Sequence, residues 1–302
     1  MGEPMGRATW GSWTALTLRA LVAVMAFLGA LGVLSGLGPW GGSLARAQAV
    51  VDLQLVLAVD VSQSMDQDEQ FLQRSGYVAA FRDKAVQKAI LSGKLKRIAV
   101  AYLEWGGANE QRLVVDWTLI DSPAAANAFA QRLAVAPISR FRLTSISSAL
   151  AYAEAMLGAS PYPGARRVID VSGDGYNNSG GPVEPARDRL IANGIAINGL
   201  PIILRSRTST VFNRRGDLDE YYAACVIGGP GAFVIAVRHP DEFATAIKRK
   251  LILEISSLEN RPPWRVRGPR RWAAHDDIGH IIKQVQAQTA TPDVDCGDRR
   301  RY

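Results

Sequence analysis

Five oxygen-bearing side chains stand where loops of the fold are expected, and together they could hold a metal ion. Asp60, Ser62 and Ser64 occupy alternate positions directly after an apolar stretch. Thr144 stands immediately ahead of an expected helix, and Asp174 lies between two glycines. All five are oxygen ligands, and none is sulfur or imidazole. The set therefore suits a hard divalent cation such as Mg²⁺, with Mn²⁺ or Ca²⁺ as alternatives.

The charges of these groups indicate what such a site could do. Two carboxylates would balance a doubly charged cation, whereas neutral hydroxyls in direct contact would leave it electrophilic. A coordination position left open on the ion would attract a carboxylate of another molecule. A purely structural explanation also exists, because Asp60 could end a strand and Ser62 or Ser64 could cap the next helix. The joint arrangement of all five residues favours the metal.

Strands and helices alternate along the chain, which predicts a parallel-rich sheet covered by helices. Six strands are expected, at 51–60, 97–105, 112–120, 166–174, 195–203 and 232–237. Helices are expected at 66–91, 122–134, 145–158 and 184–194, and from 239–240 onward. A turn with two glycines joins the second and third strands, so these two should be antiparallel. The fold class is α/β: a doubly wound, mostly parallel six-stranded sheet with one antiparallel edge strand and helices on both faces.

This topology should bring the five residues together. In such a sheet, ligands bind at the carboxyl ends of the strands, at the point where the strand order reverses. Asp60 leaves the end of the first strand, and the loops that carry Thr144 and Asp174 should reach the same edge. Asp66 and Glu69 should form a capping box, and the helix behind them should bury Phe71. Glu104, at the end of the second strand near the same edge, is expected to be a surface acid, with a carboxylate that supports the metal ligands as the alternative.

The first 49 residues predict an export leader. Arg7 and Arg19 precede an apolar stretch at 20–37, and Ala47-Gln48-Ala49 has the small-x-small pattern of a signal-peptidase site. The alternative is an uncleaved anchor, because about 18 apolar residues almost span a bilayer. Cleavage near Ala49 is favoured. It predicts a periplasmic or secreted protein that has no stable membrane span once the leader is removed.

Residues 50–260 then form one domain, and residues 261–302 a basic, loop-rich tail. The chain is 48% hydrophobic and 21% charged, which is too apolar for a disordered protein. Its formal net charge is +7, and eight arginines lie in the tail. Export argues against nucleic acid as the partner, so a solvated tail is predicted, with an acidic or lipid surface as the alternative.

The two cysteines, Cys225 and Cys296, belong to no CxxC pair and to no cluster with histidine. No structural zinc site is therefore expected. In an oxidising compartment the pair could form one disulfide that ties the tail to the domain. The sequence leaves this open, because it does not show whether the two Cα atoms come close.

The five oxygen ligands resemble, in order and context, the metal-ion-dependent adhesion site of von Willebrand factor A domains and integrin I domains. The resemblance covers roughly residues 50–258. The segments DVSQSMDQDE, VSGDGYNN and CVIGGPGAFV also look similar to an uncharacterised family of exported bacterial proteins with this fold. There is one departure: the threonine that is usual just before the loop aspartate is Gly173 here. The resemblance implies direct metal contacts from the hydroxyls and mostly water-mediated ones from the carboxylates: Ser62, Ser64 and Thr144, then Asp60 and Asp174.

A binding module is the function that this resemblance implies: an exported domain whose cation captures an Asp or Glu of a protein partner. A metal-dependent hydrolase or phosphatase is the first alternative. An aspartyl-phosphate phosphatase needs a second Asp where this chain has Ser62, and the chain has no GxSxG nucleophile elbow. The second alternative is a subunit that works with an AAA+ ATPase, which the leader disfavours because those partners are cytoplasmic. The chain is therefore predicted not to be an enzyme and to have no catalytic residues.

Overall fold

The computed structural model describes residues 2, 49–204, 217–256, 282–283, 294 and 296. The expected leader and most of the expected tail lie outside these residues. The chain divides into two compact units, 1–48 and 49–302. Within the described ranges, none of the helices combines the length and the hydrophobicity that crossing a bilayer requires.

The second unit is built around one sheet with the strand order β3-β2-β1-β4-β5-β6-β7. Strand β1 pairs in parallel with both β2 and β4, and β3 lies antiparallel to β2. The doubly wound, mostly parallel α/β class is thereby confirmed. The first six strands are β1 (Val51–Asp60), β2 (Ile98–Trp105), β3 (Gln111–Ile120), β4 (Gly164–Gly173), β5 (Ile195–Pro201) and β6 (Val234–Ile235).

The predicted tail adds a seventh strand that the sequence did not indicate. This strand, β7 (Ile282–Lys283), pairs antiparallel with β6. A disulfide between Cys225 and Cys296 is a second link from the tail to the domain, with a Cα–Cα distance of 5.6 Å. The disulfide alternative is therefore confirmed, and the tail is joined to the domain at two points.

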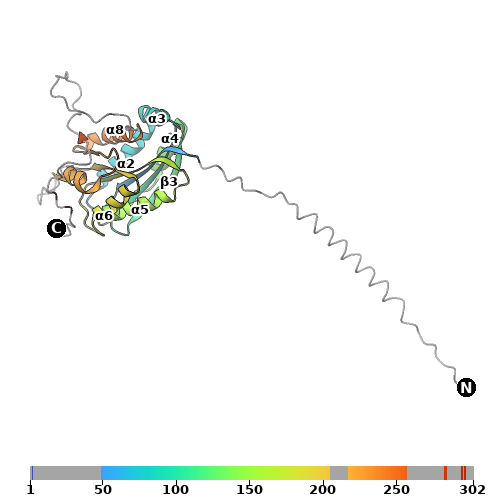
Figure 1. Cartoon of the computed structure of the whole chain (residues 1–302), viewed down its shortest axis with the longest axis horizontal. Helices are drawn as coiled ribbons and strands as arrows, with labels where there is room; N and C mark the ends of the chain where they lie inside the picture. The colour runs from blue at the N-terminus through green and yellow to red at the C-terminus, as the bar shows by residue number, and fades with distance from the viewer. Residues whose placement is uncertain are drawn as a thin grey trace. The chain divides into compact units, whose positions relative to one another are not determined.

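Helices cover both faces of the sheet (Figure 1). The side chains of β1 alternate between the two layers: Leu55 and Leu57 pack with the first group of helices, and Val56 and Ala58 with the second. The first group is α2 (Gln67–Arg82), α3 (Lys84–Leu91), α4 (Pro123–Val135) and α8 (Phe243–Ile255). The second group is α5 (Ile146–Gly158), α6 (Val183–Ala192), α7 (Leu218–Tyr221) and the π-helix η2 (Tyr222–Val226). A single 3₁₀ turn, η3 (Pro240–Glu242), leads into α8.

Two expectations about the helix at 66–91 are wrong. It is two helices, because Asp83 has extended backbone and its side chain accepts a hydrogen bond from Ala85 N (2.7 Å), which starts α3 anew. Phe71 is 63% exposed rather than buried. Near this end of α2 the buried positions are the polar Gln70 and Gln73, so Phe71 falls on the solvent side.

The strand order reverses at β1, which makes its carboxyl end the binding edge of this fold. From β1 the chain first builds β2 and β3 on one side, and then returns to place β4 on the other. Val59 of β1 lies opposite Ser172 of β4, so the two strands end side by side at Asp60 and Gly173. The loops that leave these ends carry the residues singled out in the sequence.

Candidate metal centre

The loop after β1 presents Asp60, Ser62 and Ser64. Asp60 is completely buried, and its Oδ1 accepts a hydrogen bond from Ser62 N at 2.7 Å. The helix that follows is capped by Asp66, which forms a reciprocal capping box with Glu69 as predicted. Neither serine is therefore used as the helix cap. The helix-capping explanation of Ser62 and Ser64 is wrong.

Hydrogen bonds join this loop to the loop after β4. The hydroxyl oxygens of Ser62 and Ser64 lie 2.9 Å apart, and Ser64 Oγ donates to Asp174 Oδ1 at 2.5 Å. Because the Ser64 proton points to Asp174, the proton between the serines comes from Ser62. Asp174 is buried, with 1% exposure. Two segments 110 residues apart thus meet through their side chains.

Thr144 reaches the same place from the loop before α5. Its backbone is bound to the β4–α6 loop on both sides: Thr144 N donates to Asn178 Oδ1 (2.9 Å), and Thr144 O accepts from Asn178 N (2.9 Å) and Ser179 N (3.1 Å). A Cβ placed on Gly175 would lie 3.7 Å from Thr144 Oγ1 and 4.0 Å from Ser64 Oγ. Both hydroxyl oxygens are therefore close to Gly175, and all five predicted residues lie at one edge of the sheet.

The two buried carboxylates need a proton or a positive charge beside them at this edge of the sheet. Burial first, and then the nearby Asp174, raise the pKa of Asp60 from 3.8 to about 8. Asp60 Oδ2 is buried and has no hydrogen-bond partner among the residues that the structure describes. A buried carboxylate oxygen without a donor is costly unless a proton or a cation meets it. The site thus has the donor types and the negative charge that a divalent cation needs.

The packing around position 173 explains why it has a glycine and not the usual threonine. A Cβ at this position would lie 2.8 Å from Asp60 Oδ2 and 2.9 Å from the hydroxyl of Tyr222. Tyr222 is fully buried, and its side chain fills the space that a larger residue at 173 would take. Burial, followed by the charge of Asp60, raises the pKa of Tyr222 well above its usual value.

Tyr222 is the neighbour of the site that the sequence did not reveal. It lies on η2, the same π-helix that carries the disulfide-bonded Cys225. Tyr221, which precedes Tyr222 in the chain, contacts Tyr176 of the β4–α6 loop. Their rings contact edge to face with centroids 4.8 Å apart, and Tyr221 is buried. Tyr221 is therefore a packing residue.

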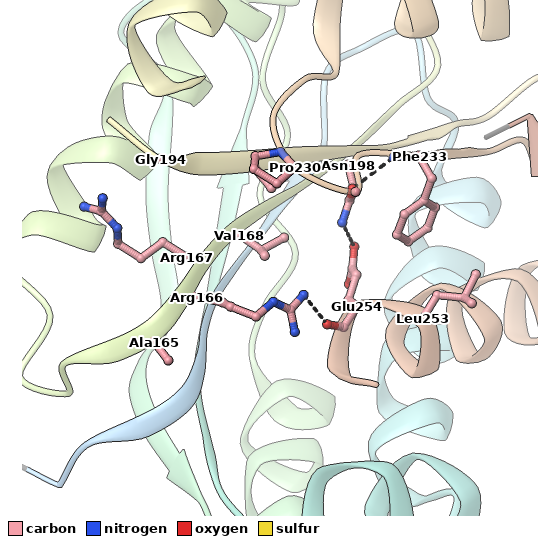
Figure 2. A pocket seen from close by; sticks show the side chains of 12 residues that line it. Ala165, Arg166, Arg167, Val168, Gly194, Asn198, Pro230, Phe233, Leu253 and Glu254 are labelled. Atoms are coloured by element: carbon pink, nitrogen blue, oxygen red, sulfur yellow. Dashed lines mark hydrogen bonds between the residues drawn. The ribbon is translucent and has the colours of Figure 1, made fainter. Parts of the chain in front are cut away.

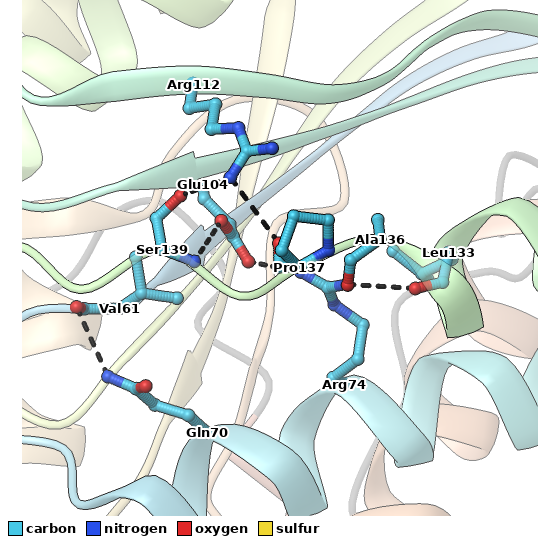
Figure 3. A network of polar contacts seen from close by, with 9 residues as sticks. All are labelled: Val61, Gln70, Arg74, Glu104, Arg112, Leu133, Ala136, Pro137 and Ser139. Atoms are coloured by element: carbon cyan, nitrogen blue, oxygen red, sulfur yellow. Dashed lines mark hydrogen bonds and ion pairs between the residues drawn. The ribbon is translucent and has the colours of Figure 1, made fainter.

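Glu104 is not the surface acid that was expected. It is fully buried and forms an ion pair with Arg74 of α2 (Figure 3). Its other oxygen accepts a hydrogen bond from Ser139 N at 2.9 Å. Arg74 Nη1 also donates to the carbonyls of Leu133 (2.9 Å) and Ala136 (3.0 Å). This network attaches the start of the α4–α5 loop, which carries Thr144, to the rigid sheet and to α2.

The family model for proteins of unknown function DUF1194 matches residues 50–259, which is most of the chain. The chain belongs to this family. No curated protein matches the sequence. The matched range ends close to the boundary expected for the domain.

Solved structures similar to this DUF1194 protein include a von Willebrand factor type A structure from Catenulispora acidiphila, with TM-score 0.44, 16% identity, and 68% of this chain and 43% of that chain covered. Another is proximal thread matrix protein 1 from the mussel byssus with a zinc-occupied MIDAS motif, with TM-score 0.48, 12% identity, and 69% of this chain and 49% of that chain covered. A third is the pilus adhesin SpaC from Lactobacillus rhamnosus GG, with TM-score 0.48, 14% identity, and 68% of this chain and 31% of that chain covered. The chain spans less than half the length of each, and at these identities the likeness concerns the fold.

The described part of the DUF1194 domain has no group of three or more His, Cys, Asp or Glu side chains that could bind a metal. The edge cluster is a different kind of donor set, since three of its five members are hydroxyls. A separate cavity of about 290 Å³ lies near the start of β4, at the opposite edge of the sheet (Figure 2). There Asn198 Nδ2 donates to Glu254 Oε1 (3.1 Å), and Arg166 donates to the Glu254 carbonyl (2.8 Å). The cavity shares no residue with the candidate site.

Proposed function

We propose that this protein is an exported binding module, periplasmic or secreted, which holds a divalent cation at the edge cluster and captures a carboxylate of a protein partner. The observation that carries the proposal is the convergence of five oxygen-bearing side chains from three loops at the strand-order reversal. Ser64 lies at the centre of this convergence, because it contacts both Ser62 and Asp174. Thr144 Oγ1 and Ser64 Oγ both lie close to Gly175.

The residues present fit a cation of the Mg²⁺ type, with Mn²⁺ or Ca²⁺ as alternatives. Hydroxyl and carboxylate oxygens are the ligands that such ions prefer. A doubly charged ion would neutralise the two buried carboxylates, of which Asp60 has an oxygen with no described hydrogen-bond partner. In the proposed arrangement Ser62, Ser64 and Thr144 would contact the ion, and Asp60 and Asp174 would act mostly through water.

The bound ion would supply an electrophilic coordination position, and the residues of the chain would fix where the ion lies. The hydroxyls are neutral, so they leave the ion with positive charge for an incoming Asp or Glu. We assign no catalytic step to the site. Of the three histidines, His239 is the one that the structure describes; it is exposed and lies at the start of η3, where its backbone N donates to Glu242 Oε2 at 3.2 Å.

The export part of the proposal is supported by two features of the chain. Residues 1–49 carry the pattern of a cleaved leader, and the Cys225–Cys296 disulfide suits an oxidising compartment. A mature protein of this kind would have no stable membrane span and no nucleic-acid partner.

Calorimetric titration of the purified protein with Mg²⁺ tests the site. We expect saturable binding by the wild type, and at least a tenfold loss of affinity in Asp60→Ala and in Ser64→Ala. Ser64 is exposed, so its variant keeps the fold even if the Asp60 variant does not. Asp121→Ala is the matched control, because Asp121 is an exposed acid beyond the end of β3, at the opposite edge of the sheet. Equal affinity in the wild type and the Ser64 variant would refute the site.

A further inference from the structure

We propose that Arg140, Arg142 and Leu143, which precede Thr144 on the α4–α5 loop, form a docking rim that selects a protein segment with additional acidic residues beside the captured carboxylate. This inference rests on the proposed function, because it names the chemistry of the partner at the same site. It starts from a contrast within one loop: Thr144 is buried, whereas the three residues of the rim are exposed.

Backbone hydrogen bonds hold this loop at several points. Ser139 N donates to the buried Glu104 (2.9 Å), and Phe141 N donates to Val61 O (3.0 Å). Arg142 N donates to Glu110 Oε2 at 3.2 Å, and Ser145 N donates to Gly106 O at 2.7 Å. Because bonds occur on both sides of the rim and within it, the rim side chains project from a fixed backbone. A fixed presentation lowers the entropy cost of binding a partner.

The side chains of the rim are exposed in the described part of the chain. Leu143 is 50% exposed, although it is a large apolar residue next to a buried one. Neither Arg140 nor Arg142 forms an ion pair with a side chain in the ranges that the structure describes. An apolar side chain next in sequence to Arg142, with neither guanidinium group ion-paired in the described ranges, suits contact with a partner segment that carries an apolar residue beside its carboxylates.

The opposite charge occurs where the β1–α2 loop enters α2. Asp66 and Asp68 are exposed, two and four residues after Ser64. The surroundings of the proposed metal are therefore acidic along the β1–α2 segment and basic along the α4–α5 loop. An extended polyanion, such as a nucleic acid or an anionic lipid surface, would be repelled by the acidic segment. A protein segment can place its extra acids toward the arginines alone, and it is the partner that this charge pattern favours.

A random peptide library displayed on phage, panned on the purified protein in Mg²⁺ and eluted with EDTA, tests the rim. We expect the eluted peptides to share an Asp or Glu with further acidic residues and an apolar residue nearby. The affinity of one selected synthetic peptide is then measured by fluorescence anisotropy. We expect it to fall about tenfold or more in Arg140→Glu/Arg142→Glu, since two attractions become repulsions. Leu143→Ser should also weaken binding.

The matched control is Lys84→Glu/Lys88→Glu, which makes the same change of charge on exposed positions of α3. Helix α2 has 16 residues and is about 24 Å long, so α3 begins that far from the β1–α2 loop. The control should bind the peptide like the wild type. Peptides that elute with EDTA but bind both double variants equally would overturn the rim and leave the proposed function standing. Failure to recover any EDTA-eluted peptide, or equal binding by Asp60→Ala, would overturn both.

Discussion

Replacing Asp60 by asparagine should change how the stability of the metal-free protein depends on pH. Asp60 is fully buried beside Asp174, and its pKa is raised from 3.8 to about 8. In EDTA the folded protein therefore holds the Asp60 proton at pH values where the unfolded chain has lost it. Stability is complete below the unfolded pKa and is lost as the pH rises toward the folded pKa. Asparagine keeps the acceptor for Ser62 N and has no charge to bury.

The size of the effect follows from the width of this pH window. Each pH unit between the two pKa values removes about 1.4 kcal/mol from the free energy of unfolding. From pH 4 to pH 8 the loss due to Asp60 is on the order of 5 kcal/mol, comparable with the whole stability of many domains. Glu254, whose pKa burial raises to about 7, gives a loss of the same sign. The difference between the wild type and the Asn variant isolates the contribution of Asp60.

Urea titrations in EDTA at several pH values between 4 and 8 measure this difference. The buried Trp105 at the end of β2 can report unfolding by fluorescence. We expect similar stabilities near pH 4 and a more stable Asn variant near pH 8. Adding Mg²⁺ at pH 8 should stabilise the wild type much more than the variant. Parallel pH profiles for the two proteins in EDTA would refute the reasoning.

Two further substitutions probe the surroundings of the site. Gly173→Ala places a Cβ 2.8 Å from Asp60 Oδ2 and 2.9 Å from the Tyr222 hydroxyl, so Mg²⁺ affinity should fall at least tenfold by calorimetry. Adding Tyr222→Phe removes one of the two clashes and should restore part of it; unchanged affinity in the single variant would contradict the assigned packing. Glu104→Gln leaves the buried Arg74 without its charge partner and should lower the free energy of unfolding by about 3–5 kcal/mol in urea titrations. A loss below about 1 kcal/mol would mean that this ion pair does not stabilise the fold.

The sheet and the gathering of the five ligands could be predicted because both depend on local patterns. The apolar run that ends at Asp60, and the helix that begins behind Thr144, each show within a dozen residues of sequence. Parallel topology then brings the strand ends to one edge. The same local reasoning placed the capping box at Asp66 and Glu69 correctly.

The failures concern contacts between residues far apart in the chain. Glu104 is buried because Arg74, 30 residues away, reaches it from α2, and no local pattern indicates that pairing. Tyr222 reaches the site from a π-helix, which has no reliable sequence signal. The break at Asp83 was missed for another reason. The apolar periodicity continues across Asp83, although this one residue ends α2 and caps the start of α3.

The disulfide closes residues 225–296, the end of the domain and most of the tail, into a covalent ring. Cys225 and Cys296 are 71 residues apart, and the segment between them contains β6, α8 and β7. A protease that cut this segment once would leave both products joined, so the damage would show on a gel only after reduction. The ring also confines β7 near β6 if their short pairing opens, which favours its return over pairing with another molecule.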